Sequence, residues 1–321
     1  MLTAVSVFAL SGCFSDGGSS SRTDASLGAP LRVTQIGFPN EITLVWALKK
    51  KIFEKHGVAV EPVTLASSAS AVAAADSGQV DLAFSGGWGA ILAASQGIKV
   101  KIVIGAYFNA TPPDPKRSRG VFATTKSGAK TYCDLVGKTV GVTELNGPGQ
   151  IYLSAAVRKA GCDDTKIKYV NIPSAQMATS MERGAVDAIN ASGVVGQTLV
   201  GKGAAIWLGD PYSDVQGRVN YGSYVASEKF AAGNGEKLKK FRAAMDEALQ
   251  QIKDPANEAE WQAMAAEFGK TTVEAIRASQ FEDLSSEVDP VALQKTADIA
   301  FEFGAIPHKV DTSSLLYEPA G

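Results

Sequence analysis

Residues 31–65 read LRVTQIGFPNEITLVWALKKKIFEKHGVAVEPVTL, and this segment alone indicates the architecture. Its two ends, Leu31–Ile36 and Val58–Leu65, are short apolar runs typical of buried strands. Between them, Gly57 marks the end of an amphipathic helix. The apolar side chains of that helix recur at helical spacing: Ile42, Leu44, Val45, Leu48, Ile52 and Phe53. A strand, a helix and a second strand in this order predict an α/β fold with largely parallel sheets.

The same alternation continues beyond this segment and is interrupted once, at residues 111–115, TPPDP, which suit neither a helix nor a central strand. A second crossing zone is expected at 209–221, after which the chain is expected to be helical. Strands are predicted at 80–84, 100–107, near Val121, and at 138–143, 168–172 and 186–190. Helices are predicted at 70–76, 90–96, 151–160, 176–183, 195–202, 237–252, 258–268, 273–280 and 291–303.

Length and composition exclude several classes of protein. The 321 residues suffice for two domains of ordinary size. A formal net charge of −2 provides no basic field for nucleic acid, so no nucleic-acid partner is expected. The only histidines, His56 and His308, lie far apart in sequence. The sequence therefore offers too few histidines for a His-based metal site, and a Ser-His-Asp triad has few candidates. Neither a metal nor a cofactor is expected.

The N-terminus is expected to carry an export signal. The apolar run Leu2–Leu10 is far shorter than the ~20 residues of a membrane-spanning helix. The stretch Leu10-Ser11-Gly12-Cys13 resembles the lipobox of bacterial lipoproteins, in which the cysteine is acylated and becomes the mature N-terminus. We expect a signal peptide over 1–13, lipidation at Cys13 and a Gly/Ser-rich tether over 14–29. The alternative is a buried N-terminal strand with an incidental cysteine.

Two cysteines remain in the mature chain, Cys133 and Cys162. Export to an oxidising compartment makes them candidates for a disulfide. Such a bridge would close a loop of about 30 residues and contribute roughly 3 to 4 kcal/mol. The alternative is two separate buried thiols.

Four segments, taken together in their order and spacing, resemble one family: the periplasmic-binding type II proteins of the taurine, alkanesulfonate and nitrate importers, also described as NMT1/THI5-like. The segments are Trp46–Val58 (WALKKKIFEKHGV), Ser77–Ala83 (SGQVDLA), Asp134–Val142 (DLVGKTVGV) and Met181–Ala188 (MERGAVDA). The similarity extends over residues 31–317, nearly the whole mature chain.

The resemblance implies a two-lobed fold of the Venus-flytrap type, each lobe a mostly parallel sheet flanked by helices. Lobe 1 is expected over 30–111 and 223–321, and lobe 2 over 112–222. It further implies a monomeric, lipid-anchored, extracytoplasmic protein that is not an enzyme. Such a protein captures a small organic anion, of sulfonate or carboxylate type, by hinge closure and delivers it to an ABC importer permease.

The family architecture places the ligand where strands end and helices begin, because helix N-termini offer unpaired N–H groups and about half a positive charge. Trp88 is expected as a wall of this cleft, with an ordinary core position as the alternative. The ligand-binding residues implied in this way are Phe38, Asn40, Glu41, Ser67, Ser68, Ser85, Gly86, Gly87, Trp88, Phe108, Thr143, Asn146, Gly147, Pro148, Ser174, Ser192 and Tyr221.

Two departures from the family put taurine in doubt as the ligand. Ser192 stands where many sulfonate-binding relatives have Trp, and Asn146–Gly149 lacks the Ser/Thr-rich stretch of the taurine binders. Aromatic residues near the expected cleft suit an organic acid instead. Three arginines near the crossing segments are either partners for a ligand carboxylate or solvated surface residues: Arg117, Arg119 and Arg218.

Three other functions compete with import. The same fold resembles enzymes of thiamine-pyrimidine and menaquinone metabolism, but no His, Cys and carboxylate constellation supports catalysis here. A ligand-sensing lobe that reports to a membrane sensor would use the same cleft physics. A surface adhesin would need no cleft and would show no saturable binding of a small molecule.

Overall fold

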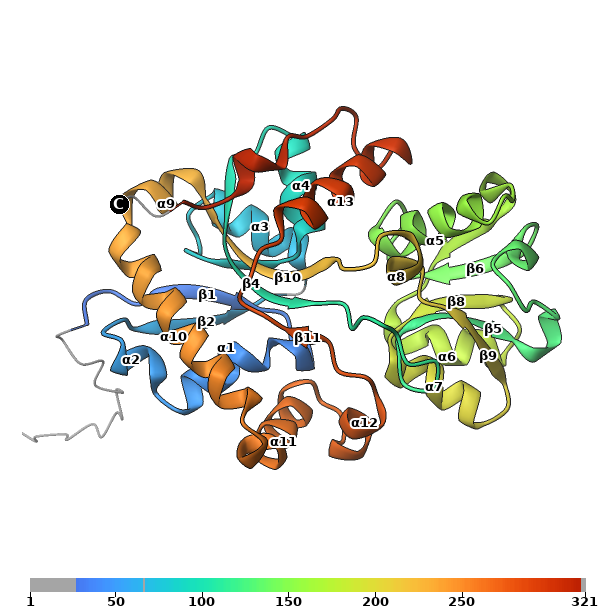
Figure 1. Cartoon of the computed structure of the whole chain (residues 1–321), viewed down its shortest axis with the longest axis horizontal. Coiled ribbons are helices and arrows are strands. Elements are labelled where there is room, and N and C mark those ends of the chain that lie inside the picture. The colour runs from blue at the N-terminus through green and yellow to red at the C-terminus, as the bar shows by residue number, and fades with distance from the viewer. Residues whose placement is uncertain (1–26, 66, 319–321) are drawn as a thin grey trace, which may run out of the picture.

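Two lobes lie along the long axis of the molecule (Figure 1). The first contains a two-stranded and a four-stranded sheet, and the second contains a five-stranded sheet. The computed structural model describes residues 27–65 and 67–318, so the expected signal peptide, the lipidation site Cys13 and most of the tether lie outside the described residues. Within the described ranges, no helix combines the length and apolarity that crossing a bilayer requires. The prediction of a two-lobed α/β fold is confirmed.

The first lobe begins with the segment quoted above. Strand β1 pairs in parallel with β2, and Leu31 lies opposite Val60. The expected single helix is divided at Lys51, whose φ of 55° is in the left-handed region. Both halves pack on the C-terminal helix α10 (Gly235–Lys253), where Phe53 stacks on Phe241. The elements of this part are β1 (Leu31–Gln35), α1 (Ile42–Lys49), α2 (Ile52–Lys55), β2 (Val60–Thr64), α3 (Ser68–Asp76), β3 (Ala83–Ser85), α4 (Gly87–Ser95) and β4 (Val100–Phe108).

The second lobe is formed by the middle of the chain. Its five-stranded sheet has the order β7-β6-β8-β5-β9 and carries helices on its faces (Figure 1). Strand β9 was not predicted from the sequence. The elements are β5 (Gly120–Thr124), β6 (Thr139–Val142), α5 (Pro148–Lys159), β7 (Lys168–Asn171), α6 (Ser174–Glu182), β8 (Ala188–Ala191), α7 (Gly193–Gly201), β9 (Ala205–Gly209) and α8 (Pro211–Val215).

The chain then returns to the first lobe through a strand that the sequence did not indicate. Strand β10 (Asn220–Ser227) inserts between β3 and β4 and is antiparallel to both. The remaining elements are α9 (Glu228–Gly233), α10, α11 (Glu258–Phe268), α12 (Val273–Ala278), β11 (Asp283–Leu284) and α13 (Pro290–Glu302). Short 3₁₀ helices occur at Pro39–Glu41, Thr125–Ser127, Cys133–Leu135, Asp164–Lys166, Pro255–Asn257 and Thr312–Leu315.

The expectation of mostly parallel sheets needs correction. In the first lobe only the β1–β2 pair is parallel, and every neighbouring pair of the four-stranded sheet β11-β4-β10-β3 is antiparallel. The five-stranded sheet of the second lobe is mixed. Strands β6, β7 and β8 are parallel, as helical crossovers require, whereas β5 is antiparallel to β8 and β9. The physical reason is that β5 and β10 enter their sheets through the segments that cross between the lobes. They do not enter through a helix on the same sheet. The lobe boundaries at 111 and 222 stay predictions.

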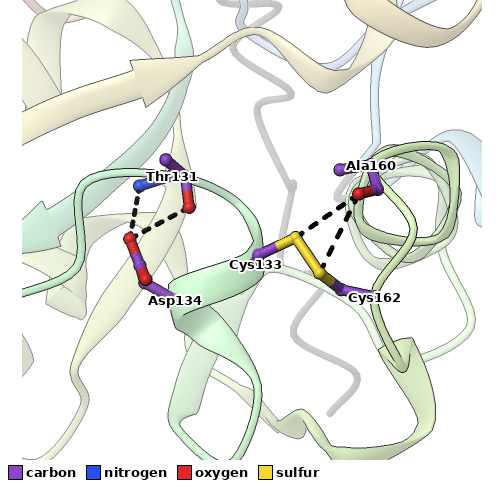
Figure 2. Close-up of a disulfide and its surroundings, with 5 residues drawn as sticks. All are labelled: Thr131, Cys133, Asp134, Ala160 and Cys162. Carbon is purple, nitrogen blue, oxygen red and sulfur yellow. Dashed lines mark hydrogen bonds between the residues drawn. A yellow bond between two sulfur atoms is a disulfide. The ribbon is translucent and has the colours of Figure 1, made fainter.

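A disulfide joins Cys133 to Cys162, with the two Cα atoms 5.6 Å apart (Figure 2). It links the 3₁₀ helix at Cys133–Leu135 to the turn that follows α5. Next to it, the carboxylate of Asp134 accepts hydrogen bonds from the backbone N–H and the hydroxyl of Thr131, each at 2.9 Å (Figure 2). The predicted bridge is therefore present, and it fastens α5 to the segment that leads into β6.

A cavity between the lobes as the candidate ligand site

A cavity of about 350 Å³ lies where the two lobes face each other. Its lining comes from α3, α4 and α13 of the first lobe and from α5 and α8 of the second. The size and the mixed origin are typical of a small-molecule site at a domain interface. Much of the wall is aromatic: Phe38, Phe84, Trp88, Tyr107, Tyr152, Tyr212 and Tyr221.

The wall of the first lobe offers hydrogen-bond donors from the start of helix α4. The first turn of an α-helix has N–H groups without intrahelical acceptors, and here the N-cap residue is Gly86, which has no side chain to accept them. A Cβ atom at Gly86 would collide with the backbone carbonyl of Tyr221. Glycine therefore lets α4 begin against β10, and Gly86, Trp88 and Gly89 at the start of this helix line the cavity.

Asn220 supplies a second donor on the same side. Its Oδ1 accepts a hydrogen bond from the Ser223 hydroxyl at 2.5 Å. Its Nδ2 is buried and has no hydrogen-bond partner within the described part of the chain. The residue is only 3% exposed and lines the cavity. A buried amide donor without a protein partner is costly, so it marks a position where a ligand acceptor would be stabilising.

The wall of the second lobe carries Glu144, Pro148, Tyr152 and Tyr212. Pro148 is the first residue of α5, where the missing proline N–H costs no helical hydrogen bond. The turn before it depends on Asn146, whose φ is 59°. Glu144 is the only charged residue among the described residues that line the cavity.

Behind the aromatic wall lies Arg119, between the two lobes. Its guanidinium carbon is 4.2 Å from the ring centre of Tyr221 and 4.9 Å from that of Tyr212. Nη1 is 3.5 Å from Oε1 of Glu282. The side chain is only 20% exposed, so of the two alternatives left open by the sequence, a solvated surface position does not apply to Arg119. It holds two cavity rings in place through cation–π contacts.

Glu282 is the charged partner of Arg119, and burial raises the pKa of its carboxyl above the ordinary value while Arg119 and the backbone N–H of Ala110 lower it. That N–H donates to Glu282 Oε2 at 2.9 Å. Ala110 and Arg119 lie at the two ends of one segment that crosses between the lobes. Glu282 contacts both ends and therefore stabilises the conformation of this crossing segment.

Glu41 was predicted as a ligand-binding residue, and the structure gives it a different position. It is 1% exposed, lies outside the cavity wall, and accepts the backbone N–H groups of Ile36 at 3.1 Å and Phe38 at 2.8 Å. Burial raises the pKa of its carboxyl to about 7, against the lowering effect of these hydrogen bonds. Glu41 therefore shapes the loop that carries Phe38 to the cavity.

The structure brings six of the predicted residues to the cavity wall: Phe38, Ser68, Gly86, Trp88, Pro148 and Tyr221. Trp88 also packs against core residues of the first lobe, so it is both a wall of the cavity and an edge of the core. The other predicted residues lie outside the wall: Asn40, Glu41, Ser67, Ser85, Gly87, Phe108, Thr143, Asn146, Gly147, Ser174 and Ser192.

Local packing explains several of these positions. The ring of Phe108 is fully buried and lies 3.6 Å beneath the guanidinium of Arg218. Ser192 is the exposed N-cap of α7, and α7 begins against the carbonyl of Arg117 on a crossing segment. Ser67 caps α3 by accepting the N–H of Ser70 at 3.2 Å. Contact of these residues with a ligand stays a prediction.

Sequence reasoning missed several residues of the wall: Phe84, Tyr107, Glu144, Tyr152, Tyr212, Asn220 and Thr296. Asn220 was not predicted as a wall residue because its segment was expected to cross between the lobes, whereas it begins strand β10. Tyr152 and Thr296 lie within helices, and the prediction considered mainly the loops that follow strands. One signal was available, since Tyr212 and Tyr221 follow the Gly-Asp-Pro turn that marks the second crossing.

No group of three or more His, Cys, Asp or Glu side chains within 27–65 and 67–318 is arranged to hold a metal ion. The cavity wall combines a helix start, a buried amide and aromatic rings. The family profile described as NMT1/THI5-like matches residues 38–259. The chain belongs to the NMT1/THI5-like family. No curated protein sequence matches the chain.

Solved structures share the fold of this NMT1/THI5-like chain. The periplasmic aliphatic sulphonate binding protein SsuA from Escherichia coli superposes with a TM-score of 0.73 at 21% identity, over 90% of this chain and 97% of that one. The nitrate-binding protein NrtA from Synechocystis PCC 6803 gives 0.69 at 16% identity, over 89% and 84%. The alkanesulfonate-binding protein SsuA from Xanthomonas axonopodis pv. citri, bound to MOPS, gives 0.71 at 18% identity, over 90% and 98%. At these identities the likeness establishes the periplasmic-binding fold.

Proposed function

We propose that this protein is the extracytoplasmic solute-binding component of an ABC importer and that it captures a small organic anion, of sulfonate or carboxylate type, between its lobes. The observation that supports this most strongly is the composition of the cavity wall. The start of α4 and Nδ2 of Asn220 offer donors to an oxyanion, and aromatic rings surround them. Helix N-termini bind anions through unpaired N–H groups and a partial positive charge.

The proposed mechanism is hinge closure. Trp88 belongs to one lobe and Tyr212 to the other, so a ligand that contacts both favours the closed arrangement. A ligand shifts such an equilibrium only by its difference in affinity for the two states. The permease would then recognise the closed form.

Delivery to a permease requires the protein to stay at the membrane surface. Acylation of Cys13 would supply this anchor, with the Gly/Ser-rich tether allowing the lobes to reach the permease. The binding unit is proposed to act as a monomer, because one chain contributes both walls of the cavity.

A thermal-shift panel of sulfonates, aliphatic and aromatic carboxylates, nitrate and pyrimidine amines tests the proposal. A ligand at roughly 100 times its dissociation constant should add about 2.7 kcal/mol to the free energy of unfolding. Melting curves that stay unchanged across the whole panel would remove the organic-anion assignment. Loss of uptake of the identified ligand in a deletion strain is expected for an importer component, whereas unchanged uptake would point to a sensor.

A further inference from the structure

A second groove separates the lobes on the other side of the crossing segments from the ligand cavity. Its walls are α7 of the second lobe and α12 of the first, and Pro115 and Lys116 of the first crossing segment also line it. We call it the rear groove. Its volume is about 460 Å³, and it shares no described lining residue with the cavity. In Figure 1, α13, α5 and α8 of the cavity lie above the crossing segments, whereas α7 and α12 lie below them.

The first crossing segment is attached to both walls of the rear groove. On the side of the second lobe, Nε2 of Gln197 on α7 donates to the carbonyl of Pro115 at 3.1 Å. On the side of the first lobe, Nη2 of Arg117 donates to the carbonyl of Ser279 at 2.9 Å, directly after α12. Because both lobes hold this segment, a change in their relative orientation turns about it.

The lobes are closed on the cavity side. The hydroxyl oxygens of Tyr152 on α5 and Thr296 on α13 are 3.2 Å apart. At the far ends of the same two helices, the guanidinium carbon of Arg158 lies 4.1 Å from the ring centre of Phe303. Opening of the cavity must therefore move α5 away from α13. Since the crossing segments lie between the cavity and the rear groove, the rotation that widens the cavity narrows the rear groove.

The walls of the rear groove suit close contact between the two helices. Val194 and Val200 of α7 face the groove from one side, and Ala275 and Ala278 of α12 line it from the other. Lys116 is the one charged residue of the described lining. Small apolar side chains let two helices approach closely, and their burial is favourable. Contact between α7 and α12 would therefore stabilise the arrangement in which the cavity is open.

We propose that the rear groove sets the ligand affinity of the cavity. Packing of α7 on α12 favours the open lobes, and a bound ligand must offset the loss of this packing when the lobes close. The size of the side chains in the rear groove thus determines the fraction of molecules that is closed before a ligand binds. This inference rests on the proposed hinge closure and adds residues that determine affinity without contacting the ligand.

An aromatic ring added to either wall tests the inference. The variants are Ala278→Phe on α12 and Thr198→Phe on α7, and both positions are exposed and line the rear groove. A cavity of roughly 150 Å³ already holds a benzene ring, so the rear groove accommodates the new side chain while the lobes are closed. When the lobes open, the ring would obstruct the approach of α7 to α12. The closed arrangement should therefore be favoured.

The matched controls carry the same substitutions at exposed helical positions outside the cavity and the rear groove. They are Ala259→Phe on α11 of the first lobe and Thr179→Phe on α6 of the second. Melting temperatures of all four variants verify that they fold. A general effect of an added surface phenyl group would appear in the controls as well as in the variants of the rear groove.

Two measurements on the full chain follow the equilibrium. Small-angle scattering without ligand should give a smaller radius of gyration for both variants of the rear groove than for the wild type and the controls. Calorimetry with hexanesulfonate and with benzoate should show that a probe bound by the wild type binds the variants at least about fivefold more tightly. The apparent dissociation constant falls as the closed fraction rises, and overpacking of this kind typically shifts an equilibrium by that factor or more.

The outcomes separate this inference from the proposed function. A radius of gyration equal to that of the wild type in both variants would overturn the inference, and so would an unchanged or weaker affinity for a probe that binds the wild type. The scattering comparison needs no ligand and therefore decides the inference even if neither probe binds. Unchanged melting curves across the whole thermal-shift panel would instead remove the organic-anion assignment and leave the role of the rear groove in place.

Discussion

The phenolic oxygen of Tyr152 lies 3.2 Å from Oγ1 of Thr296, so the two hydroxyl groups are within hydrogen-bonding distance between the two lobes. Tyr152 is on α5 of the second lobe and Thr296 is on α13 of the first. Gln216 joins the contact by accepting from Tyr152 at 2.6 Å and donating to the carbonyl of Ala292 at 2.9 Å. This buried polar contact connects the lobes beside the cavity, so it influences how readily they separate.

Replacing Thr296 with Val is expected to favour separation of the lobes in the ligand-free protein. The substitution keeps the shape of the side chain and removes the hydroxyl, which should raise the open population roughly two- to tenfold. Small-angle scattering without ligand measures the radius of gyration. The control is Glu302→Gln, because Glu302 and Arg158 also face each other across the lobes but are exposed, and such pairs contribute little. Identical scattering for wild type and Thr296→Val would contradict the expectation.

Replacing Trp88 with Ala should weaken ligand binding at least about tenfold, since truncating an aromatic anchor in a cavity usually costs more than 1 kcal/mol. Calorimetry with any ligand from the thermal-shift panel measures this. Trp261→Ala is the matched control, because Trp261 packs on Phe281 with ring centres 5.1 Å apart and does not line the cavity. It should lower the melting temperature and leave the affinity unchanged. Equal affinity of Trp88→Ala and the wild type would place the ligand elsewhere.

Removing the charge of Arg119 should destabilise the fold. In Arg119→Leu, Glu282 remains buried without its cationic partner, and the free energy of unfolding should fall by about 3 kcal/mol. Adding Glu282→Gln should restore much of the loss, since the amide oxygen still accepts the N–H of Ala110. Urea unfolding of the single and double variants measures the coupling. Strictly additive losses would show that the two side chains act independently.

Breaking the disulfide should lower stability without changing ligand affinity. The bridge joins residues separated by 29 positions, so the loop-entropy relation gives a loss of roughly 3 to 4 kcal/mol for the double variant Cys133→Ser with Cys162→Ser. Neither cysteine lines the cavity. Chemical unfolding and calorimetry on the same samples measure the two effects. A large drop in affinity would mean that the bridge also sets the position of α5.

The helices and most strands were predictable because their signals are local. The periodicity of residues 258–268 gave both ends of α11 correctly. Trp88 was placed at the cavity because it follows two glycines at the end of a predicted strand. In contrast, β10 contains Gly222 and the polar residues Asn220 and Ser223, and it pairs with strands far earlier in the sequence. Strand β10 forms because of its pairing with β3 and β4, so no local sequence pattern predicted it.

The cavity wall was only partly predictable for a related reason. A loop motif shows where helices begin, and this found Phe38, Gly86 and Pro148. The crossing segments determine the relative orientation of the two lobes, and this orientation decides which face of a helix meets the other lobe. Tyr152 was not predicted because the sequence does not indicate this orientation. Glu41 lies in the expected loop but outside the cavity wall, because its carboxylate accepts hydrogen bonds from the backbone of that loop.

Glu41 should also make stability depend on pH. Its carboxyl has a pKa of about 7 in the folded protein, raised by burial from an ordinary value of 4.5. The folded state therefore holds this proton more tightly than the unfolded state. Below pH 4.5 both states are protonated, and between 4.5 and about 7 only the unfolded state ionises. Stability is consequently highest at the acidic end of this window and falls by up to about 3 kcal/mol as the pH rises through it.

The variant Glu41→Gln cannot ionise, so its free energy of unfolding should lack this decline. Subtracting its pH profile from that of the wild type isolates the contribution of Glu41, because other titrating groups are common to both proteins. Glu61→Gln is the control, since Glu61 is exposed on β2 and its removal should leave the wild-type slope intact. Urea titrations at several pH values across the window provide the measurement. Parallel profiles for the wild type and Glu41→Gln would mean that the hydrogen bonds from Ile36 and Phe38 keep the carboxylate ionised despite its burial.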